Sequence, residues 1–336
     1  MPGVLGDRLA ARTLELIDIP SPSRDEAQLA EHVRSLLDAE DLGDTCLLAR
    51  TGAPVLLAGH LDTVPIQDNV PGRRDDERVH GAGASDMKGA LAVMIELALA
   101  GAPFDCLFFG REELPGKYSA LTPLLAREPL DYALVVMMEP TANELHAGCV
   151  GNVNATWTFT GRSAHSARPW DGENAIHAAA RGIAALAEHE PEEHVFDGLT
   201  FYEVASVTEI EGGIASNVVP DRAVCGVNYR FAPGRTPDAA RARLRELCAG
   251  GELVIDSLAP SGAVATQNPL AQALIAAGEL KVAPKQAWTT VAEFGLAGID
   301  AVNFGPGEPA QAHRRDESIE IAALVRCYEV LEAFAR

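Results

Sequence analysis

The feature that most constrains the fold is a short apolar segment followed directly by a polar cluster, a pattern that recurs along the chain. These apolar segments span residues 55–59, 106–110, 132–138 and 301–304. Helical segments lie between them, for example at 87–100 and 121–127. Buried strands that alternate with helices predict an α/β fold, here a doubly wound mixed sheet with helices on both faces.

The middle of the chain has a different pattern. Half-buried strands are expected at 153–160, 200–210 and 222–231, and helices at 175–189 and 237–248. Strands and helices in these proportions indicate a two-layer α+β module. A length of 336 residues is typical of about two domains. We therefore expect an α/β domain made of residues 1–150 and 259–336, interrupted by an inserted module at 151–258.

The N-terminal region is expected to contain two amphipathic helices, at residues 7–18 and 25–40, because their apolar residues recur at helical spacing. Ser23 lies just before the second helix and is a candidate N-cap. The first ten residues carry Asp7 and Arg8 and have no apolar block, so no signal peptide is expected. The apolar run at 90–100 is interrupted by Glu96 and is too short to cross a bilayer.

The negative net charge of the chain excludes polyanionic partners. Lys and Arg number 27 against 48 Asp and Glu, which gives a formal net charge of −21. Such a chain should repel nucleic acid and anionic membranes, so neither is expected as a partner. The six cysteines form no C-x-x-C pair and are expected to be buried, reduced thiols. Together these features favour a soluble cytoplasmic protein.

The polar clusters after the strands contain the candidate functional residues: His60, Asp62, Glu112, Glu113, Glu139 and His313. Open α/β sheets bind their ligands at the carboxyl ends of the strands, so these side chains should gather there. Each residue taken alone also has a simpler interpretation. The His60–Asp62 pair could be structural, Glu112 and Glu113 could form a solvated turn, and His313 could be a surface histidine.

Asp86 lies in a glycine-rich segment, residues 81–89, just before an apolar helix. As an isolated residue it could be an acidic N-cap. The segment is a poor dinucleotide fingerprint, because Asp86 occupies the position of the third glycine in G-x-G-x-x-G.

Taken together, the candidates are two histidines and three or more carboxylates, which is at least five ligands. This mixture of nitrogen and oxygen donors suits zinc, and also manganese or cobalt. Five ligands are too many for one catalytic tetrahedral zinc that must keep a position open. They fit two metal ions about 3.5–4 Å apart that share a carboxylate.

The chain resembles the dinuclear zinc amidohydrolases and exopeptidases of the aminoacylase and carboxypeptidase type. The resemblance covers nearly the whole chain and rests on ordered motifs: HLDTVP at 60–65, GASDMKG at 83–89, REE at 111–113, MEPT at 138–141, GRSAHSARP at 161–169, SNVVPD at 216–221 and NYRFAPG at 228–234. It implies that the interrupted domain is the catalytic dinuclear-metal domain. It also implies that the inserted module is a lid and dimerisation domain, and that the protein is a homodimer.

The resemblance also implies roles for individual residues. His60 and Glu139 would bind one metal ion, Glu113 and His313 the other, and Asp86 both. Asp62 would orient His60, and Glu112 would be the general base.

In the inserted module, the resemblance implies that His165 and Asn217 reach an active site, in many members that of the partner subunit. Arg230 would pair with a substrate carboxylate, which its planar guanidinium fits well.

Within the family, residues 164–180 and 288–313 are similar to succinyl-diaminopimelate desuccinylases of the actinobacterial type. This similarity implies hydrolysis of N-succinyl-L,L-2,6-diaminopimelate in lysine and cell-wall precursor synthesis. Relatives commonly have Asp and Arg, near the expected substrate-binding edge, where this chain has Thr290 and Glu293. They commonly have Gly where it has Met138.

Three alternatives stay open. The enzyme could be a deacylase or carboxypeptidase acting on another small anionic N-acyl amino acid, such as acetylornithine, or on a small peptide. The chain could be a metal-binding scaffold without activity. An oxidoreductase would rest only on Gly81 and Gly83.

Overall fold

The chain folds into two compact units. The computed structural model describes residues 2–114 and 116–336. Unit 1 comprises the described residues of Met1–Gly148, Ala263–Lys285 and Thr290–Arg336, and unit 2 comprises Cys149–Gly262 and Gln286–Thr289. The expected boundaries placed residues 286–289 in the α/β domain, whereas in the structure they belong to unit 2. The reason is local bonding: the Gln286 amide group bonds both main-chain polar groups of Tyr202, and Trp288 Nε1 donates to Pro260 O.

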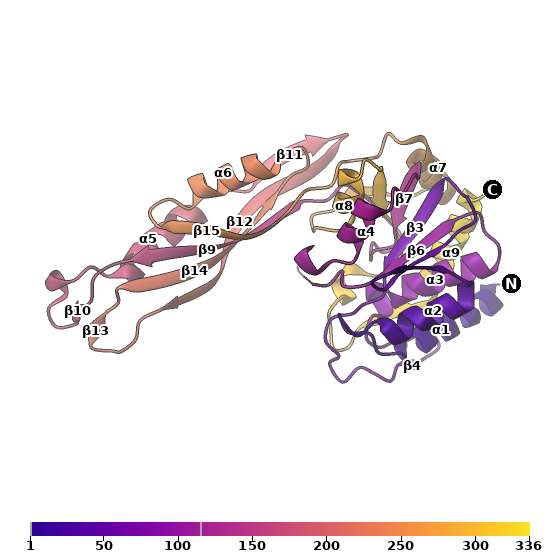
Figure 1. Cartoon of the computed structure of the whole chain (residues 1–336), viewed down its shortest axis with the longest axis horizontal. Coiled ribbons are helices and arrows are strands. Elements are labelled where there is room, and N and C mark those ends of the chain that lie inside the picture. The colour runs from indigo at the N-terminus through magenta and orange to yellow at the C-terminus, as the bar shows by residue number, and fades with distance from the viewer. Residues whose placement is uncertain (1, 115) are drawn as a thin grey trace. The chain divides into compact units, whose positions relative to one another are not determined.

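Unit 1 is built on a mixed eight-stranded sheet (Figure 1). In spatial order its strands are β1 (Glu40–Gly43), β2 (Cys46–Ala49), β6 (Asp105–Phe109), β3 (Val55–His60), β7 (Leu134–Met137), β17 (Ala301–Asn303), β8 (Leu145–Ala147) and β16 (Val282–Pro284). The central strands β6, β3, β7 and β17 are parallel and buried along their whole length. Their continuous apolar sequences are therefore those of strands covered on both faces.

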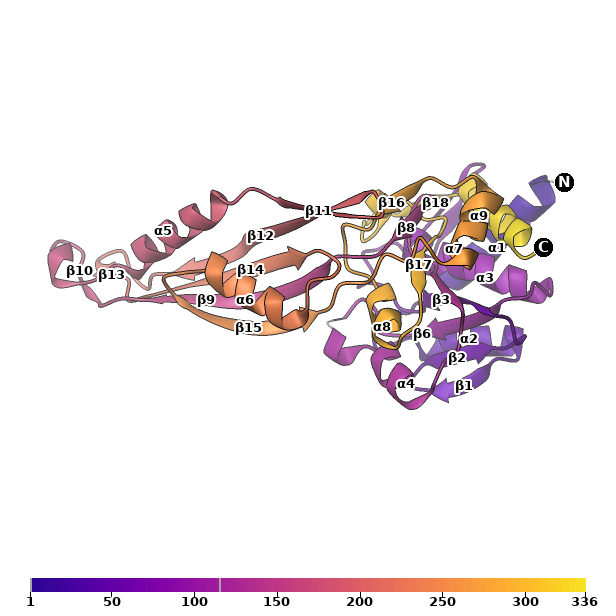
Figure 2. The same ribbon diagram turned by 90° about the horizontal axis from the view of Figure 1, so that it is seen from above.

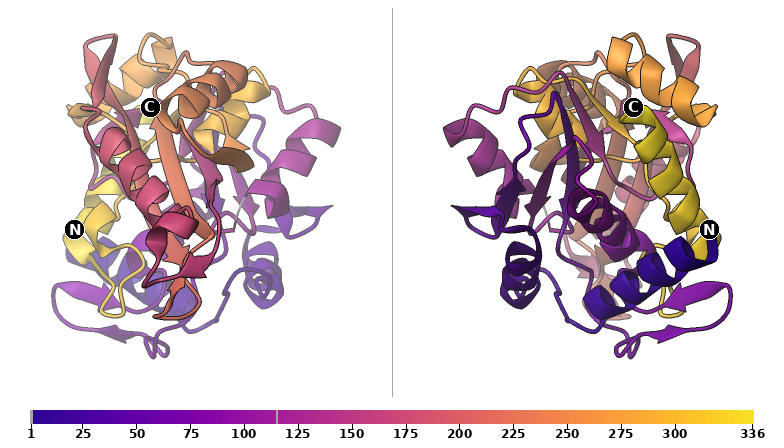
Figure 3. Two further views of the ribbon diagram at one scale, coloured as in Figure 1. Left: turned by 90° about the vertical axis from the view of Figure 1, so that its left-hand side faces the viewer. Right: turned by 90° about the vertical axis from the view of Figure 1, so that its right-hand side faces the viewer.

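Helices cover this sheet in two groups, so the predicted doubly wound α/β architecture is confirmed (Figure 2). The first group is α1 (Pro2–Ile17), α2 (Ala27–Leu37), α3 (Gly89–Leu99), α7 (Pro269–Gly278) and α9 (Ile321–Phe334). The second group is α4 (Leu121–Arg127) and α8 (Val291–Leu296), which pack against each other. The right-hand view of Figure 3 shows the indigo α1 beside the yellow α9, so the first and last helices pack in one layer.

One predicted helix start is wrong. The N-cap position of α2 is Glu26, not Ser23. The Ser23 hydroxyl instead donates to Asp62 Oδ2 at 2.7 Å, which places this serine beside the site described below.

A small antiparallel sheet also lies in unit 1, with the order β18 (Ser318–Glu320), β5 (Arg78–His80) and β4 (Arg73–Arg74).

Unit 2 is a five-stranded antiparallel sheet with two helices on one face (Figure 2). Its strands in spatial order are β11 (Glu192–Phe196), β12 (Leu199–Gly212), β14 (Arg222–Phe231), β9 (Gly151–Thr160) and β15 (Glu252–Ala259). Alternate residues of β9 and β14 are buried against α5 (Ala175–Ala187) and α6 (Pro237–Leu247), and Trp157 lies in this core. A short ribbon pairs β10 (Ala164–His165) with β13 (Val218–Val219). The predicted two-layer α+β module is confirmed.

All six cysteines are buried, as expected. A search of the described helices for one long and apolar enough to span a bilayer finds none.

Candidate active site

The predicted acids and histidines of unit 1 gather at the carboxyl ends of its central parallel strands. His60 is the last residue of β3, Glu112 and Glu113 follow β6, and Glu139 follows β7. Strand β3 lies between β6 and β7 in the sheet, and the chain runs from β3 to β6 and then across to β7. The strand order therefore changes direction at β3, and ligands of open α/β sheets bind at such a point.

Asp86 lies between the two histidines. Its Oδ1 is 3.2 Å from His60 Nε2, and its Oδ2 is 3.4 Å from His313 Nε2. Asp86 is part of a wide turn, Ala84–Lys88, and its backbone is not helical (φ −127°, ψ 87°). The N-cap of α3 is Lys88, so the N-cap interpretation of Asp86 is wrong. With one oxygen toward each histidine, Asp86 has the orientation that a carboxylate shared by two cations needs.

His313 completes the site from the loop after β17. Its Nε2 lies 3.1 Å from Glu113 Oε1. Hydrogen bonds with Asp86 and Glu113 raise the pKa of His313 to about 10. A neighbouring pair of carboxylates thus favours a positive charge at this position when no other cation is bound.

Asp62 acts mainly on the acidic pair rather than on His60. Its Oδ1 accepts from the backbone N–H of Glu112 at 3.0 Å, and its Oδ2 accepts from that of Glu113 at 3.1 Å. His60 Nδ1 lies 2.9 Å from the backbone oxygen of Asp62 but 3.7 Å from its carboxylate. The main chain at Asp62 therefore orients the His60 ring, and the Asp62 side chain holds the turn that carries Glu112 and Glu113.

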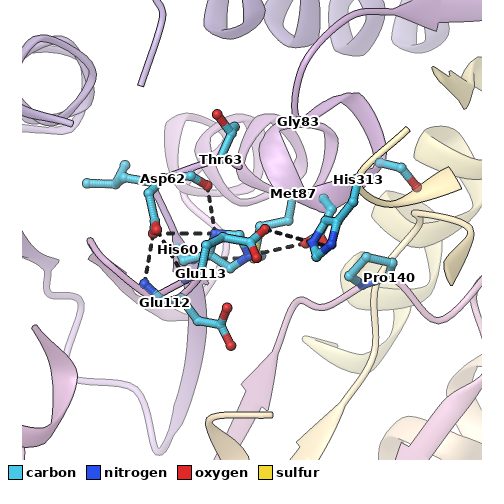
Figure 4. A network of polar contacts seen from close by, with 12 residues as sticks. His60, Asp62, Thr63, Gly83, Met87, Glu112, Glu113, Pro140 and His313 are labelled. Atoms are coloured by element: carbon cyan, nitrogen blue, oxygen red, sulfur yellow. Dashed lines mark hydrogen bonds and ion pairs between the residues drawn. The ribbon is translucent and has the colours of Figure 1, made fainter. Parts of the chain in front are cut away.

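The adjacent acids Glu112 and Glu113 point in different directions (Figure 4). The Glu113 carboxylate lies beside His313, and the Glu112 carboxylate points away from it. Burial raises the pKa of Glu112 well above its ordinary value, and the Glu139 carboxylate raises it further. Burial and Asp86 raise the pKa of Glu139 to about 7. Four carboxylates lie close together in the site and repel one another unless protons or cations lie between them: Asp86, Glu112, Glu113 and Glu139.

The residues fit metal ions. One ligand atom each from His60, Glu112 and Glu139 lie within 4.8 Å of one another, and the same holds for His60, Asp86 and Glu113. Glu139 Oε1 is buried and has no hydrogen-bond partner among the described residues. A buried carboxylate oxygen without a partner is costly, and a bound cation would supply the missing partner. The mixed nitrogen and oxygen donors suit zinc, cobalt or manganese.

A third acidic group, Glu192, His194 and Glu203 in unit 2, is of a different kind. The Glu203 carboxylate already accepts hydrogen bonds from Tyr229 Oη, the backbone N–H of Ala232 and Arg235 Nε. We interpret this group as structural, because an arginine already neutralises its buried carboxylate.

The predicted residues of unit 2 fall into two places. His165 and Asn217 are neighbours at the β10–β13 ribbon, where the Ser166 N–H donates to Asn217 O. This ribbon lies next to the start of β14, at Arg222. Arg230 lies near the opposite end of that strand, and its Nε donates to Asn228 Oδ1 at 2.9 Å. From Arg222 to Arg230 an extended strand covers about 27 Å. Within one chain, the His165–Asn217 pair and Arg230 are thus too far apart to hold the same small molecule.

The two unusual residues of the 290–293 segment are buried inside unit 1. The Glu293 carboxyl accepts hydrogen bonds from Ser119 and Thr122, and burial raises its pKa. Thr290 is also buried, and its hydroxyl has no partner among the described residues. The polarity of Glu293 is therefore satisfied within the unit.

Two polar residues near the site were not assigned to it from the sequence. Ser23 donates to Asp62, as described above. The buried Glu317 accepts hydrogen bonds from the backbone N–H groups of Gly83, Ser85 and Asp86. The available sequence signals were the position of Glu317 four residues after His313 and a glycine-rich segment, residues 81–89, whose N–H groups need acceptors.

Comparison with known proteins shows the family. Residues 56–336 match the model of peptidase family M20/M25/M40. A Mycobacterium tuberculosis protein provisionally named succinyl-diaminopimelate desuccinylase DapE is 38% identical over 340 residues, which cover 96% of each chain. The succinyl-diaminopimelate desuccinylase of Corynebacterium glutamicum is 35% identical, covering 98% of this chain and 96% of the relative.

Solved structures agree on the fold. The aminopeptidase PepT from Bacillus cereus matches with a TM-score of 0.77 at 19% identity, covering 98% of this chain and 97% of the other. The chain is therefore a member of peptidase family M20/M25/M40 and an enzyme of the amide-hydrolysing class.

Proposed function

We propose that this protein is a dinuclear metal-dependent desuccinylase. It would hydrolyse N-succinyl-L,L-2,6-diaminopimelate to succinate and L,L-2,6-diaminopimelate, a step in the synthesis of lysine and cell-wall precursors. The observation that carries the hydrolase part is Asp86, whose two oxygens lie toward His60 and His313 in a site with three further carboxylates. Support for the succinyl substrate comes from the names of the relatives at 38% and 35% identity.

In this proposal the ligands divide between two divalent ions. His60 and Glu139 hold one, Glu113 and His313 hold the other, and Asp86 is shared. Zinc is the proposed ion, with cobalt or manganese as alternatives. When bound, such ions supply a polarised amide carbonyl and a water molecule of lowered pKa.

Glu112 is the proposed general base. Its carboxylate takes a proton from water while the water oxygen bonds to the carbonyl carbon of the succinyl amide. Glu112 then gives that proton to the amide nitrogen as the C–N bond breaks, which releases succinate and the amine. Burial in a carboxylate-rich site raises the affinity of Glu112 for protons, as this role requires. Asp62 assists by holding the backbone of Glu112 and Glu113.

Unit 2 supplies the proposed substrate contacts. His165 would donate to the developing oxyanion, Asn217 would lie beside it, and Arg230 would pair with a substrate carboxylate. Because His165 and Asn217 lie far along the sheet from Arg230, one substrate can contact all three only if two chains contribute. This separation supports a homodimer whose lid and dimerisation domain is unit 2. The location we propose is the cytoplasm, with no nucleic acid or membrane partner.

The second candidate is a deacylase or carboxypeptidase for another N-acyl amino acid or small peptide. Thr290 and Glu293 favour it, because the family resemblance leads us to expect Asp and Arg at these two positions. The burial of Glu293 against Ser119 and Thr122 weakens this argument, since its carboxyl is already engaged.

A substrate panel separates the two candidates. The zinc-loaded and cobalt-loaded enzyme is assayed on N-succinyl-L,L-2,6-diaminopimelate, N-acetylornithine and a set of dipeptides. The proposal requires the succinyl substrate to have the highest kcat/KM. A higher value for any other member of the panel would assign the enzyme to the second candidate.

A further inference from the structure

Glu317 is a buried acid whose side-chain hydrogen bonds, among the residues that the structure describes, all go to the loop that carries Asp86. It is 3% exposed and lies in unit 1, just before β18. Its Oε2 accepts from the Gly83 N–H at 2.9 Å. Its Oε1 accepts from the N–H groups of Ser85 at 2.8 Å and Asp86 at 2.9 Å. The Glu317 carbonyl oxygen also accepts from the Gly81 N–H at 3.0 Å.

The loop needs such a partner because it does not follow a regular helix. At Asp86 the backbone leaves helical geometry. The N–H groups of Gly83, Ser85 and Asp86 all reach the Glu317 carboxyl group, while the Ala84 N–H donates to Gly81 O. Buried N–H groups without acceptors are costly, and a concave set of them binds an anion. Gly83 has a φ of +77°, and an added Cβ would lie 2.7 Å from Thr63 Cγ2. The loop is therefore confined to this path, and the Glu317 carboxyl group supplies the acceptor oxygens at the point where these N–H groups meet.

We propose that Glu317 is a positioning residue for the metal site. By bonding the Asp86 N–H directly, it fixes the backbone from which the Asp86 carboxylate reaches His60 on one side and His313 on the other. His313 and Glu317 belong to one segment, so the same stretch of chain supplies a ligand and the anchor for the shared ligand. This inference rests on the proposed role of Asp86 as that shared ligand.

The bonding pattern predicts which substitutions matter. Glutamine keeps the size of Glu317 but has one acceptor atom, and its amide NH2 would face an N–H donor of the loop. Aspartate keeps the charge but is one methylene shorter, so it cannot keep all three hydrogen bonds at their present lengths. Both E317Q and E317D should therefore loosen the position of Asp86.

Asp105 offers a matched control in the same unit. It is 2% exposed, and its Oδ1 accepts from the backbone N–H groups of Thr51, Gly52 and Ala53. It begins β6, whereas Glu112 and Glu113 follow the other end of that strand. D105N removes the same kind of anchor at a place remote from Asp86.

The test compares wild type, E317Q, E317D and D105N after removal of metal. Thermal unfolding of the metal-free proteins measures the structural cost, and calorimetric titration with Zn²⁺ measures affinity and stoichiometry. The visible absorption spectrum with Co²⁺ reports ligand geometry. We expect E317Q, E317D and D105N to lower Tm. Only E317Q and E317D should weaken Zn²⁺ binding, by about 10- to 100-fold, and alter the Co²⁺ spectrum.

Zn²⁺ affinity and a Co²⁺ spectrum in E317Q and E317D equal to those of D105N would overturn the inference, since Glu317 would then be only structural. The proposed function fails differently: it fails if the wild-type protein itself binds fewer than two Zn²⁺ ions per chain.

Discussion

At the residue scale, the site shows how far side-chain type and spacing can be interpreted. The gathering of five side chains could be predicted, because each lies at or after the end of a recognisable strand or in the glycine-rich segment: His60, Asp86, Glu113, Glu139 and His313. The hydrogen-bond partner of each side chain could not be predicted. Whether Asp62 bonds His60 or the Glu112 turn depends on distances of a few tenths of an ångström, which only packing sets. Ser23 illustrates the same limit, because its hydroxyl lies 2.7 Å from Asp62 Oδ2 and 3.5 Å from Thr63 O, and packing decides which oxygen is nearer.

The first prediction concerns Glu112. E112Q keeps the shape of the side chain but removes its ability to take a proton, so kcat should fall about 10²- to 10⁴-fold. Zinc content should stay near that of the wild type, because Glu112 is not a proposed ligand. E31Q, at an exposed acid paired with Arg34, is the control and should retain full activity. Unchanged turnover in zinc-loaded E112Q would dismiss the general-base role.

At the element scale, elements with a clear apolar pattern were predictable, and short strands without one were not. Strand β14 and helix α4 begin and end where the apolar pattern placed them. Strands β4, β8, β16 and β18 have two or three residues each, too few to show alternation, and become strands only through their neighbours. The turn at Ala84–Lys88 is similar, because the acceptor of the hydrogen bonds that shape it is Glu317, which lies far away in the sequence.

The second prediction concerns how Glu203 joins β12 to the β14–α6 connection. Hydrogen bonds from Arg235, Tyr229 and the Ala232 N–H outweigh burial and lower the pKa of Glu203. Glu192 and His194 also lie near it. A lowered pKa means that this stabilisation is present above the unfolded-state value and is lost as pH falls through the folded-state value.

E203Q should therefore destabilise unit 2 by about 1–3 kcal/mol near pH 7, and by clearly less near pH 4. Urea unfolding followed by tryptophan fluorescence measures this directly, because all three tryptophans, Trp157, Trp170 and Trp288, belong to unit 2. An equal loss at both pH values would mean that the charge on Glu203 is unimportant.

At the scale of the whole molecule, the insertion was visible as a change in pattern near residue 150. The exact residues of the inserted unit could not be predicted, because the separate segment Gln286–Thr289 joins unit 2 through hydrogen bonds with Tyr202 and Pro260. The net charge of −21 does not describe the charge at the proposed metal site. Two divalent ions would add four positive charges, leaving −17, and all four would lie at the site. An anionic substrate would then meet cations and Arg230 rather than the average surface.

The third prediction follows from the proposed homodimer. If His165 serves the active site of the partner subunit, a heterodimer of E112Q and H165A contains one complete site. Mixing equal amounts of the two inactive variants under subunit exchange should restore about a quarter of wild-type activity. An E112Q sample mixed with itself is the control. No recovery in a mixture shown by mass to contain heterodimers would place His165 at the site of its own chain or at none.

The central claim, an amide hydrolase with two metal ions per chain, is tested most directly by titrating the metal-free enzyme with zinc. Bound zinc and the rate of N-succinyl-L,L-2,6-diaminopimelate hydrolysis are measured in the same samples. The account predicts no hydrolysis without zinc and a rate that reaches its maximum at two zinc ions per chain. Hydrolysis by the metal-free enzyme, or a maximal rate at one zinc ion per chain with no second ion bound, would contradict it.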